Sequence, residues 1–134
     1  MIGAVIITHG SLAASLLEAA ELIAGKAENI KAISVKSSDA TELVRSSLTQ
    51  AVKEVNSGNG VVIFTDMFGG TPTNIALSVL EVGKIEVVTG VNLPIVLRFL
   101  NHRGNRQLKE LVTLLKEYGQ KSIVLAGDML KDGM

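Results

Sequence analysis

Short apolar runs alternate with amphipathic segments along the whole chain. Five short runs are rich in apolar residues, and the early ones are apolar throughout, which is typical of strands buried on both faces of a sheet. They lie at residues 2–8, 30–35, 58–66, 84–90 and 121–127. The run at 30–35 is the weakest, and the run at 58–66 opens with a turn. The pattern therefore predicts five strands.

The segments between these runs carry apolar residues at helical spacing and polar residues suited to helix ends. Ser11 and Asn92 stand where a helix would begin, and Asp39 with Glu42 forms a capping-box pattern. Thr71, followed by a proline, fits the cap of another helix. The predicted helices cover about residues 11–25, 39–56, 71–83, a short segment after 92, and 105–118.

The alternation of strands and helices indicates an α/β fold. At 134 residues the chain has the size of a single domain. Right-handed crossovers between parallel strands put helices on both faces, so we expect an open three-layer sandwich with a mostly parallel five-stranded sheet. A flavodoxin-like arrangement would order the first four strands 2-1-3-4. Every strand-to-helix loop would then lie at the carboxyl edge of the sheet.

Three of these loops are similar to one another. Each begins with a threonine at a strand end: T-H-G-S at 8–11, T-D-M-F-G-G-T-P at 65–72 and T-G-V-N at 89–92. Open α/β sheets bind ligands where neighbouring connections leave on opposite faces, which here is between strands one and three. The loops that meet there carry His9 and Asp66, so we expect these two side chains to lie close together.

A histidine beside a carboxylate suits covalent chemistry on the imidazole ring. Asp66 would accept the Nδ1–H of His9, fix the tautomer and leave Nε2 free as a nucleophile. Backbone N–H groups of Gly69 and Gly70, with the positive end of the helix starting at Thr71, would bind an anion in the same space. Each feature is ordinary alone, but together they indicate a transient phosphohistidine.

The composition excludes several other functions. Apolar residues make up 47% of the chain and aromatic residues 3%, so the core must be aliphatic and no aromatic surface exists for stacking bases. A formal net charge of zero argues against binding of nucleic acid or anionic membranes. The chain has no cysteine, no metal-ligand spacing and no G-x-x-x-x-G-K loop. His102, at a polar helix end, is expected to be a solvated surface residue.

The sequence also bears on location. The first ten residues, MIGAVIITHG, do not have the pattern of a signal peptide. No apolar run approaches the ~18 residues that a membrane span needs, so direct membrane insertion is not expected. A cytoplasmic protein is the default expectation.

The loop motifs resemble those of the IIA component of the mannose family of the bacterial sugar phosphotransferase system. The specific stretch is TDMFGGTPTN at 65–74, strengthened by TGVNLP at 89–94 and THG at 8–10. The similarity covers about residues 2–126, so residues 1–134 are expected to form a single IIA domain. The resemblance implies that His9 is phosphorylated and that Asp66 is its hydrogen-bond partner. It also implies that Thr71, where members often have serine, lies near the phosphoryl group.

The resemblance further implies a reaction and its partners. The chain would be a phosphotransferase in sugar transport, working without a metal or cofactor. It would accept a phosphoryl group from the histidine-containing phosphocarrier protein and pass it to a IIB protein. Some members are fused to a IIB domain, but this chain ends too soon for one, so a separate IIB protein is expected. The family also implies a homodimer, whose last strand runs antiparallel at the sheet edge and can exchange between subunits.

Two other functions stay open at this point. A regulatory phospho-acceptor would act by binding a partner rather than by sugar uptake. The phosphotransfer subunit of dihydroxyacetone kinase resembles the same fold, although the glycine-rich stretch FGGTPTN at 68–74 favours the mannose family.

Overall fold

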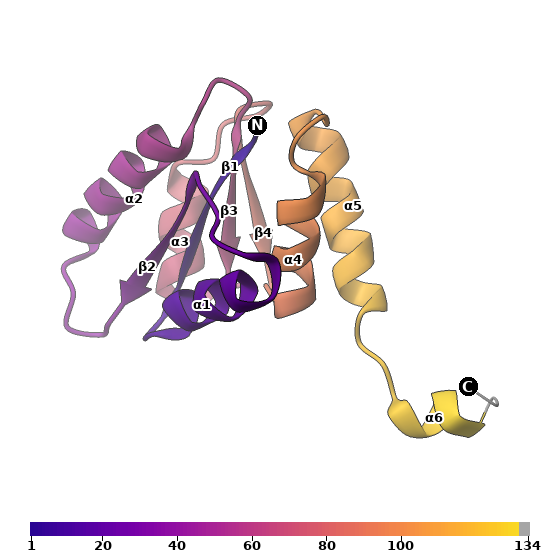
Figure 1. The fold of residues 1–134 in the computed structure, drawn as a ribbon. Helices are drawn as coiled ribbons and strands as arrows, with labels where there is room; N and C mark the ends of the chain where they lie inside the picture. Colours follow the sequence, from indigo (N-terminus) through magenta and orange to yellow (C-terminus); the bar gives the residue numbers. More distant parts are fainter. Residues whose placement is uncertain (132–134) are drawn as a thin grey trace.

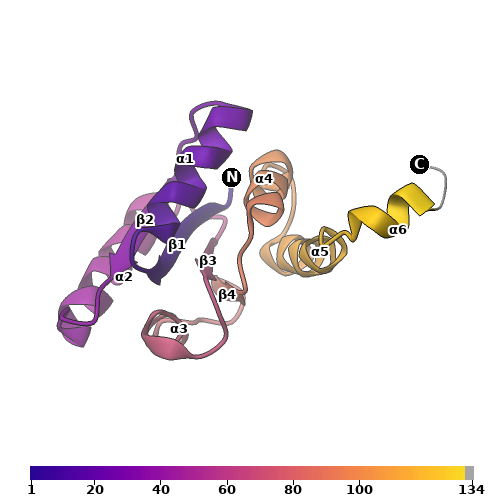
Figure 2. The ribbon, with the colours of Figure 1, turned by 90° about the horizontal axis from the view of Figure 1, so that it is seen from below.

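The computed structural model describes residues 1–131 and shows one sheet between two helical layers (Figure 1, Figure 2). Within these residues the sheet has four parallel strands in the order β2-β1-β3-β4. The strands are β1 (Gly3–His9), β2 (Ile30–Val35), β3 (Val61–Thr65) and β4 (Ile85–Thr89). The helices are α1 (Leu12–Ala24), α2 (Thr41–Val55), α3 (Gly70–Ser78), α4 (Leu93–His102), α5 (Leu108–Lys121) and α6 (Ala126–Lys131). The predicted α/β class and the order of the first four strands are confirmed.

Helices cover both faces of the sheet, with α1, α4 and α5 on one face and α2 and α3 on the other (Figure 2). Each layer has its own group of buried aliphatic side chains. Successive residues of β1 alternate between the groups: Ala4 and Ile6 pack on the α1 side, Val5 and Ile7 on the α2 side. Both faces of β1 are therefore buried, which explains its uninterrupted apolar sequence.

The carboxyl ends of the four strands lie at one edge of the sheet. Figure 2 shows the molecule from the side of this edge. Thr65 ends β3 and is opposite Ile7 of β1 and Thr89 of β4. His9 lies two residues further along β1 than Ile7. Its neighbour in the sheet is Val35 of β2. The last residue of β1 therefore extends past the end of β3, toward the loop that follows Thr65.

Two predicted helix starts are correct, one of them with a different cap. Asn92 caps α4, because its side-chain oxygen accepts the backbone N–H of Ile95 at 3.0 Å. Ser11 occupies the N-cap position of α1, but its side chain makes no capping hydrogen bond. The hydroxyl of Thr8 accepts the backbone N–H of Ala13 at 2.8 Å instead. The threonine at the end of β1 thus takes over the capping role.

Two other predicted caps are wrong. Ala40 is the N-cap of α2, and the carboxylate of Asp39 accepts the backbone N–H of Lys36 at 2.7 Å rather than capping the helix. Gly69 is the N-cap of α3, so Thr71 is the second residue of that helix. The loop before α2 uses Asp39 for its own turn, whereas α3 begins one residue before Thr71, directly after Gly69 at positive φ.

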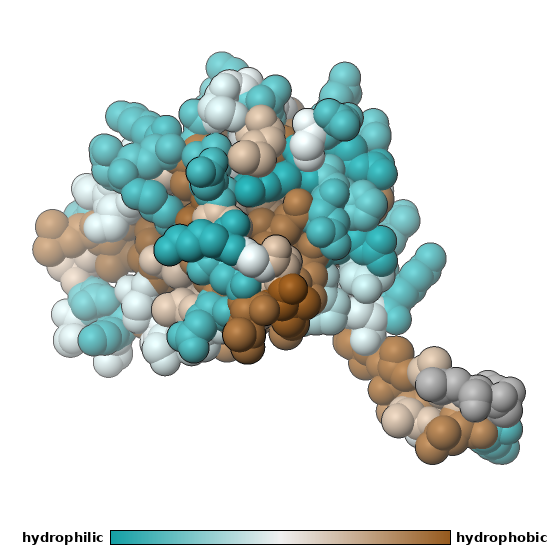
Figure 3. All heavy atoms as spheres, in the orientation of Figure 1, coloured by the Kyte–Doolittle hydropathy of each residue, from teal (hydrophilic) through white to brown (hydrophobic). Residues whose placement is uncertain are grey.

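The predicted fifth strand at 121–127 is also wrong. α5 continues to Lys121, residues 122–125 are irregular, and α6 begins at Ala126. A strand needs a neighbouring strand to accept and donate its backbone hydrogen bonds, and within residues 1–131 this segment pairs with none. Figure 1 shows it leaving the domain with α6, and Figure 3 shows apolar side chains along it. We call residues 122–131 the C-terminal arm.

Candidate functional site

Two side chains from neighbouring loops meet at the carboxyl edge of the sheet. His9 is the last residue of β1, and Asp66 directly follows β3. Oδ2 of Asp66 lies 2.8 Å from Nδ1 of His9 and also accepts the backbone N–H of His9 at 3.0 Å. The predicted contact between these residues is present, although they are 57 positions apart in the sequence.

These hydrogen bonds orient the imidazole ring. An ionised carboxylate only accepts hydrogen bonds, so Nδ1 must carry the proton and Nε2 keeps a lone pair in the neutral ring. The side chain of His9 is 51% exposed, whereas that of Asp66 is 13% exposed. The site therefore pairs an accessible nitrogen nucleophile with a largely buried carboxylate that holds it in place.

The carboxyl group of Asp66 stays ionised despite its burial. Burial raises its pKa, but hydrogen bonds from the backbone N–H and ring of His9, with the charge of the ring, outweigh burial and hold the pKa below its ordinary value. Oδ1 of Asp66 is buried and has no hydrogen-bond partner within residues 1–131. Oδ2 alone thus makes both contacts with His9.

Gly70, the second of the two glycines, lies beside the imidazole ring. A β-carbon on Gly70 would be 3.0 Å from Cε1 and 3.2 Å from Nε2 of His9. Gly70 and Gly69 have φ values of +80° and +101°, which other residues rarely adopt. α3 therefore begins beside Nε2, where the positive end of its dipole favours an anion. Thr71 is exposed in the first turn of α3, and its role near a phosphoryl group stays a prediction.

Strand β2 holds the turn that follows His9. The hydroxyl of Ser34 donates to the backbone carbonyl of Gly10 at 2.6 Å. The backbone N–H of Gly10 donates to the carbonyl of Val35 at 2.9 Å. The backbone N–H and the backbone carbonyl of Gly10 are both hydrogen-bonded to β2, so the ring of His9 projects from a fixed backbone.

Two residues near the site were missed in the sequence. Ser34 sits in the weakest predicted strand, and Thr73 lies within a predicted helix, so neither position suggested a contact with a loop. The hydroxyl of Thr73 is buried and hydrogen-bonds the loop before α3. Buried hydroxyl groups must find partners, but burial of a single threonine is set by tertiary packing and is not visible in the local pattern.

His102 lies away from this site. It ends α4, which runs from the carboxyl edge back toward the start of β1, where the carbonyl of Arg103 accepts the backbone N–H of Ile2. Its Nε2 lies 3.4 Å from Nη1 of Arg98 on the same helix. In the described part of the chain, no three His, Cys, Asp or Glu side chains are grouped as a metal site would require. Nor does any helix there have the length and apolarity to span a membrane.

Several known proteins with similar sequences or structures are named as components of one transport system. Residues 3–116 match the family described as PTS system fructose IIA component. The PTS system fructose-specific EIIA component of Bacillus subtilis (strain 168) is 32% identical over 132 residues, which is 98% of this chain and 90% of that protein. The PTS system mannose-specific EIIAB component of Escherichia coli (strain K12) is 32% identical over 124 residues, 91% of this chain and 38% of that protein.

The structural similarity is equally extensive. The crystal structure of phosphotransferase system component EIIA from Streptococcus agalactiae matches this fold with a TM-score of 0.85 and 29% sequence identity. The match covers 96% of this chain and 99% of that one. The whole α/β sandwich described above, including its sheet, is therefore shared.

We expect replacement of His9 by alanine to raise the pKa of Asp66. The variant keeps a backbone N–H donor but loses the ring, so burial is opposed less strongly. Carbon-13 NMR titration of the Asp66 carboxyl group measures both values, and His102→Ala serves as the matched control that leaves the midpoint in place.

The depressed pKa of Asp66 also determines how the stability of the fold changes with pH. Because the folded pKa is depressed, the ionised Asp66 contributes stability above its unfolded pKa, and this contribution is lost as the pH falls through the lower folded value. An Asp66 midpoint that is equal in the wild type and His9→Ala would show that the ring does not stabilise the carboxylate.

Proposed function

This chain belongs to the mannose/fructose family of IIA components of the sugar phosphotransferase system, and from that membership we propose that it carries a phosphoryl group on His9. Proteins of this family act as phosphotransferases in sugar transport. The observation that carries the proposal is the half-exposed imidazole of His9, held at Nδ1 by the buried carboxylate of Asp66.

Nε2 of His9 is the nucleophile in this mechanism. Its lone pair attacks the phosphorus of a phosphohistidine on the donor protein. A new N–P bond forms as the donor's N–P bond breaks, and the electron pair of the broken bond returns to the donor ring. The reaction exchanges similar bonds between side chains, so it is nearly isoenergetic and needs no metal.

Asp66 stabilises the charge that this step creates. The imidazole ring gains positive charge as Nε2 bonds to phosphorus, and Nδ1–H remains directed at Oδ2 of Asp66. The carboxylate is already in place before the reaction, so little reorganisation is required. Its depressed pKa keeps it ionised at neutral pH, when that stabilisation is needed.

The start of α3 would form the binding site for the phosphoryl oxygens. Gly70, the first residue of α3, lies close to Nε2, and the backbone N–H groups of Gly69 and Gly70 with the positive end of the helix would bind these oxygens. Thr71, in the first turn, would add a hydroxyl donor. A larger side chain at Gly70 would enter the space of the imidazole ring.

The donor in this proposal is the histidine-containing phosphocarrier protein, and the acceptor is a separate IIB protein. The relay would operate in the cytoplasm. Similarity to EIIA components of fructose and mannose systems supports sugar transport over the dihydroxyacetone kinase subunit. It equally supports transport over a purely regulatory phospho-acceptor.

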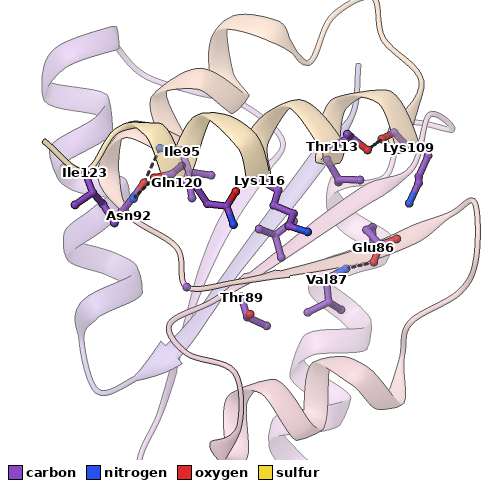
Figure 4. A pocket seen from close by; sticks show the side chains of 14 residues that line it. Glu86, Val87, Thr89, Asn92, Ile95, Lys109, Thr113, Lys116, Gln120 and Ile123 are labelled. Atoms are coloured by element: carbon purple, nitrogen blue, oxygen red, sulfur yellow. Dashed lines mark hydrogen bonds between the residues drawn. The ribbon is translucent and has the colours of Figure 1, made fainter.

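The C-terminal arm and the edge of β4 support a homodimer. Within residues 1–131, β4 pairs with β3 on one side only, and a groove of about 530 Å³ separates its other side from α5. Figure 4 shows β4 and α5 as the two walls of this groove. Side chains from both walls line it: Glu86, Val87, Thr89, Lys109, Thr113, Lys116 and Gln120.

The arm has the chemistry to fill such a groove. Ile123 is 78% exposed and Leu125 is 70% exposed, which is costly for apolar side chains in water. We infer that the irregular residues 122–125 of a second subunit pair with the free edge of β4. The pairing would satisfy the outer edge of β4 and bury the apolar side chains of the arm.

His9→Ala should abolish phosphorylation, because among residues 1–131 the other histidine, His102, lies beside Arg98 rather than beside a carboxylate. The assay supplies phosphoenolpyruvate, the phosphocarrier and the phosphocarrier's kinase, and follows an acid-labile, base-stable label. His102→Ala is the matched control and should be labelled at the wild-type rate. Persistent labelling of His9→Ala would remove His9 from the mechanism.

Gly70→Ala should slow labelling of His9 about ten-fold or more relative to Gly69→Ala. Both variants place a β-carbon at positive φ and share that backbone strain. Only at Gly70 does the β-carbon crowd Nε2, whereas Gly69 faces open space. Equal rates in the two variants would show that the approach of Gly70 to the ring does not matter.

The wild-type protein should be a dimer at micromolar concentration, and the double change Ile123→Glu and Leu125→Glu should make it a monomer. Charged side chains cannot be buried against β4 without a large desolvation penalty. Leu22→Glu, on the exposed face of α1, is the control that should remain dimeric. Light scattering decides, and a monomeric wild type would contradict the inference.

A further inference from the structure

Two buried hydroxyl groups hold the loop between β3 and α3 from the inside. Thr65 ends β3 and Thr73 is the fourth residue of α3, and both are at most 1% exposed. Their hydroxyl oxygens lie 2.7 Å apart. The hydroxyl of Thr73 also donates a hydrogen bond to the backbone carbonyl of Met67, in the middle of the loop.

The direction of these hydrogen bonds follows from the number of protons. A carbonyl only accepts, so the single proton of Thr73 goes to Met67. The proton between the two threonines must then come from Thr65. The result is a chain in which Thr65 donates to Thr73 and Thr73 donates to Met67. Both hydrogen bonds of this chain therefore need the hydroxyl of Thr73.

The position of Met67 in the loop gives this chain a consequence for the site. Asp66, one residue earlier, binds Nδ1 of His9, and Gly70, three residues later, lies against the opposite side of the ring. The side chain of Met67 is exposed, so its carbonyl bond to Thr73 is what ties this part of the loop to the interior. A shift of the Met67 peptide would move both contacts with His9.

We propose that Thr73 is a positioning residue for the reaction at His9. It acts through the loop, by fixing the distance of Asp66 and Gly70 from the two sides of the imidazole ring. This inference rests on the proposed phosphotransfer function for its effect on rate. Its effect on the ring is independent of that function, because Asp66 sets the tautomer of His9 in the absence of any donor.

The hydroxyl is needed, rather than the shape of the side chain. Valine has nearly the same shape as threonine, but it would leave the buried hydroxyl of Thr65 without its acceptor and the carbonyl of Met67 without this donor. The loop would relieve this penalty by turning the Met67 peptide toward solvent. Displacements of about 1 Å from the reactive geometry cost up to about a hundred-fold in rate.

The experiment compares Thr73→Val with Thr73→Ser, which keeps the hydroxyl. Thr49→Val is the matched control, because Thr49 is exposed in α2 and lies outside both the site and the groove. Labelling of His9 is measured against phosphocarrier concentration, so that kcat and KM separate. Nitrogen-15 NMR of the His9 ring, without any donor, reports its tautomer, and the amide spectrum confirms folding.

Thr73→Val should lower kcat about ten-fold with KM within two-fold of wild type, and its ring should lose the single Nδ1–H tautomer. Thr73→Ser and Thr49→Val should match the wild type in both measurements. Wild-type kcat and tautomer in Thr73→Val would overturn the proposal, as would a serine variant as slow as the valine variant.

Failure of the proposed function has a different signature. In that case the wild type itself takes no label, while the tautomer of His9 still reports whether Thr73 positions the loop. A ring that keeps its Nδ1–H tautomer in Thr73→Val would then overturn the positioning role by itself.

Discussion

The hydrogen bond between Nδ1 of His9 and Oδ2 of Asp66 is the constraint on which the rest of this site depends. It decides which ring nitrogen is free, and it keeps a negative charge next to a ring that becomes positive during reaction. It forms because β1 and β3 are neighbours in the sheet and because β1 extends two residues past the end of β3. Strand order and strand length thus determine the chemistry of one imidazole.

The fold does not need this hydrogen bond, which frees the site for function. A hydrogen bond to a charged group contributes about 1.5–3 kcal/mol. Full burial of one isoleucine side chain contributes a similar amount, and β1 alone has Ile6 and Ile7 fully buried. Two aliphatic layers therefore hold the sheet, while hydroxyl groups at its edge hold the loops. The strand-end threonines Thr8 and Thr65 contribute to the core and to the loops, because they are buried and also hydrogen-bonded to the segments that follow.

The elements predicted correctly are those that a local sequence pattern or the alternation of strands and helices determines. The run at 2–8 is apolar throughout because both faces of β1 are buried, and His9 and Asp66 could be brought together because strand order determines which loops meet. The predicted cap at Asp39 is wrong because the loop uses that carboxylate for its own turn, and the predicted cap at Thr71 is wrong because α3 already begins at Gly70. The strand at 121–127 failed because a strand forms only against a neighbour, and apolarity does not say which chain supplies it. Thr73 was missed because its burial depends on how α3 packs against β3.

The most direct test of the central claim is the identity of the phosphorylated ring nitrogen. Correlation of phosphorus-31 with the ring protons of phosphorylated His9 distinguishes the two isomers. A phosphoryl group on Nε2 couples to protons on both adjacent carbons, Cε1 and Cδ2. A group on Nδ1 couples to the Cε1 proton alone, because the adjacent Cγ carries none. The structure predicts coupling to both protons, since Asp66 occupies Nδ1. Coupling to the Cε1 proton alone would show that Asp66 does not reserve Nδ1 and would contradict the account.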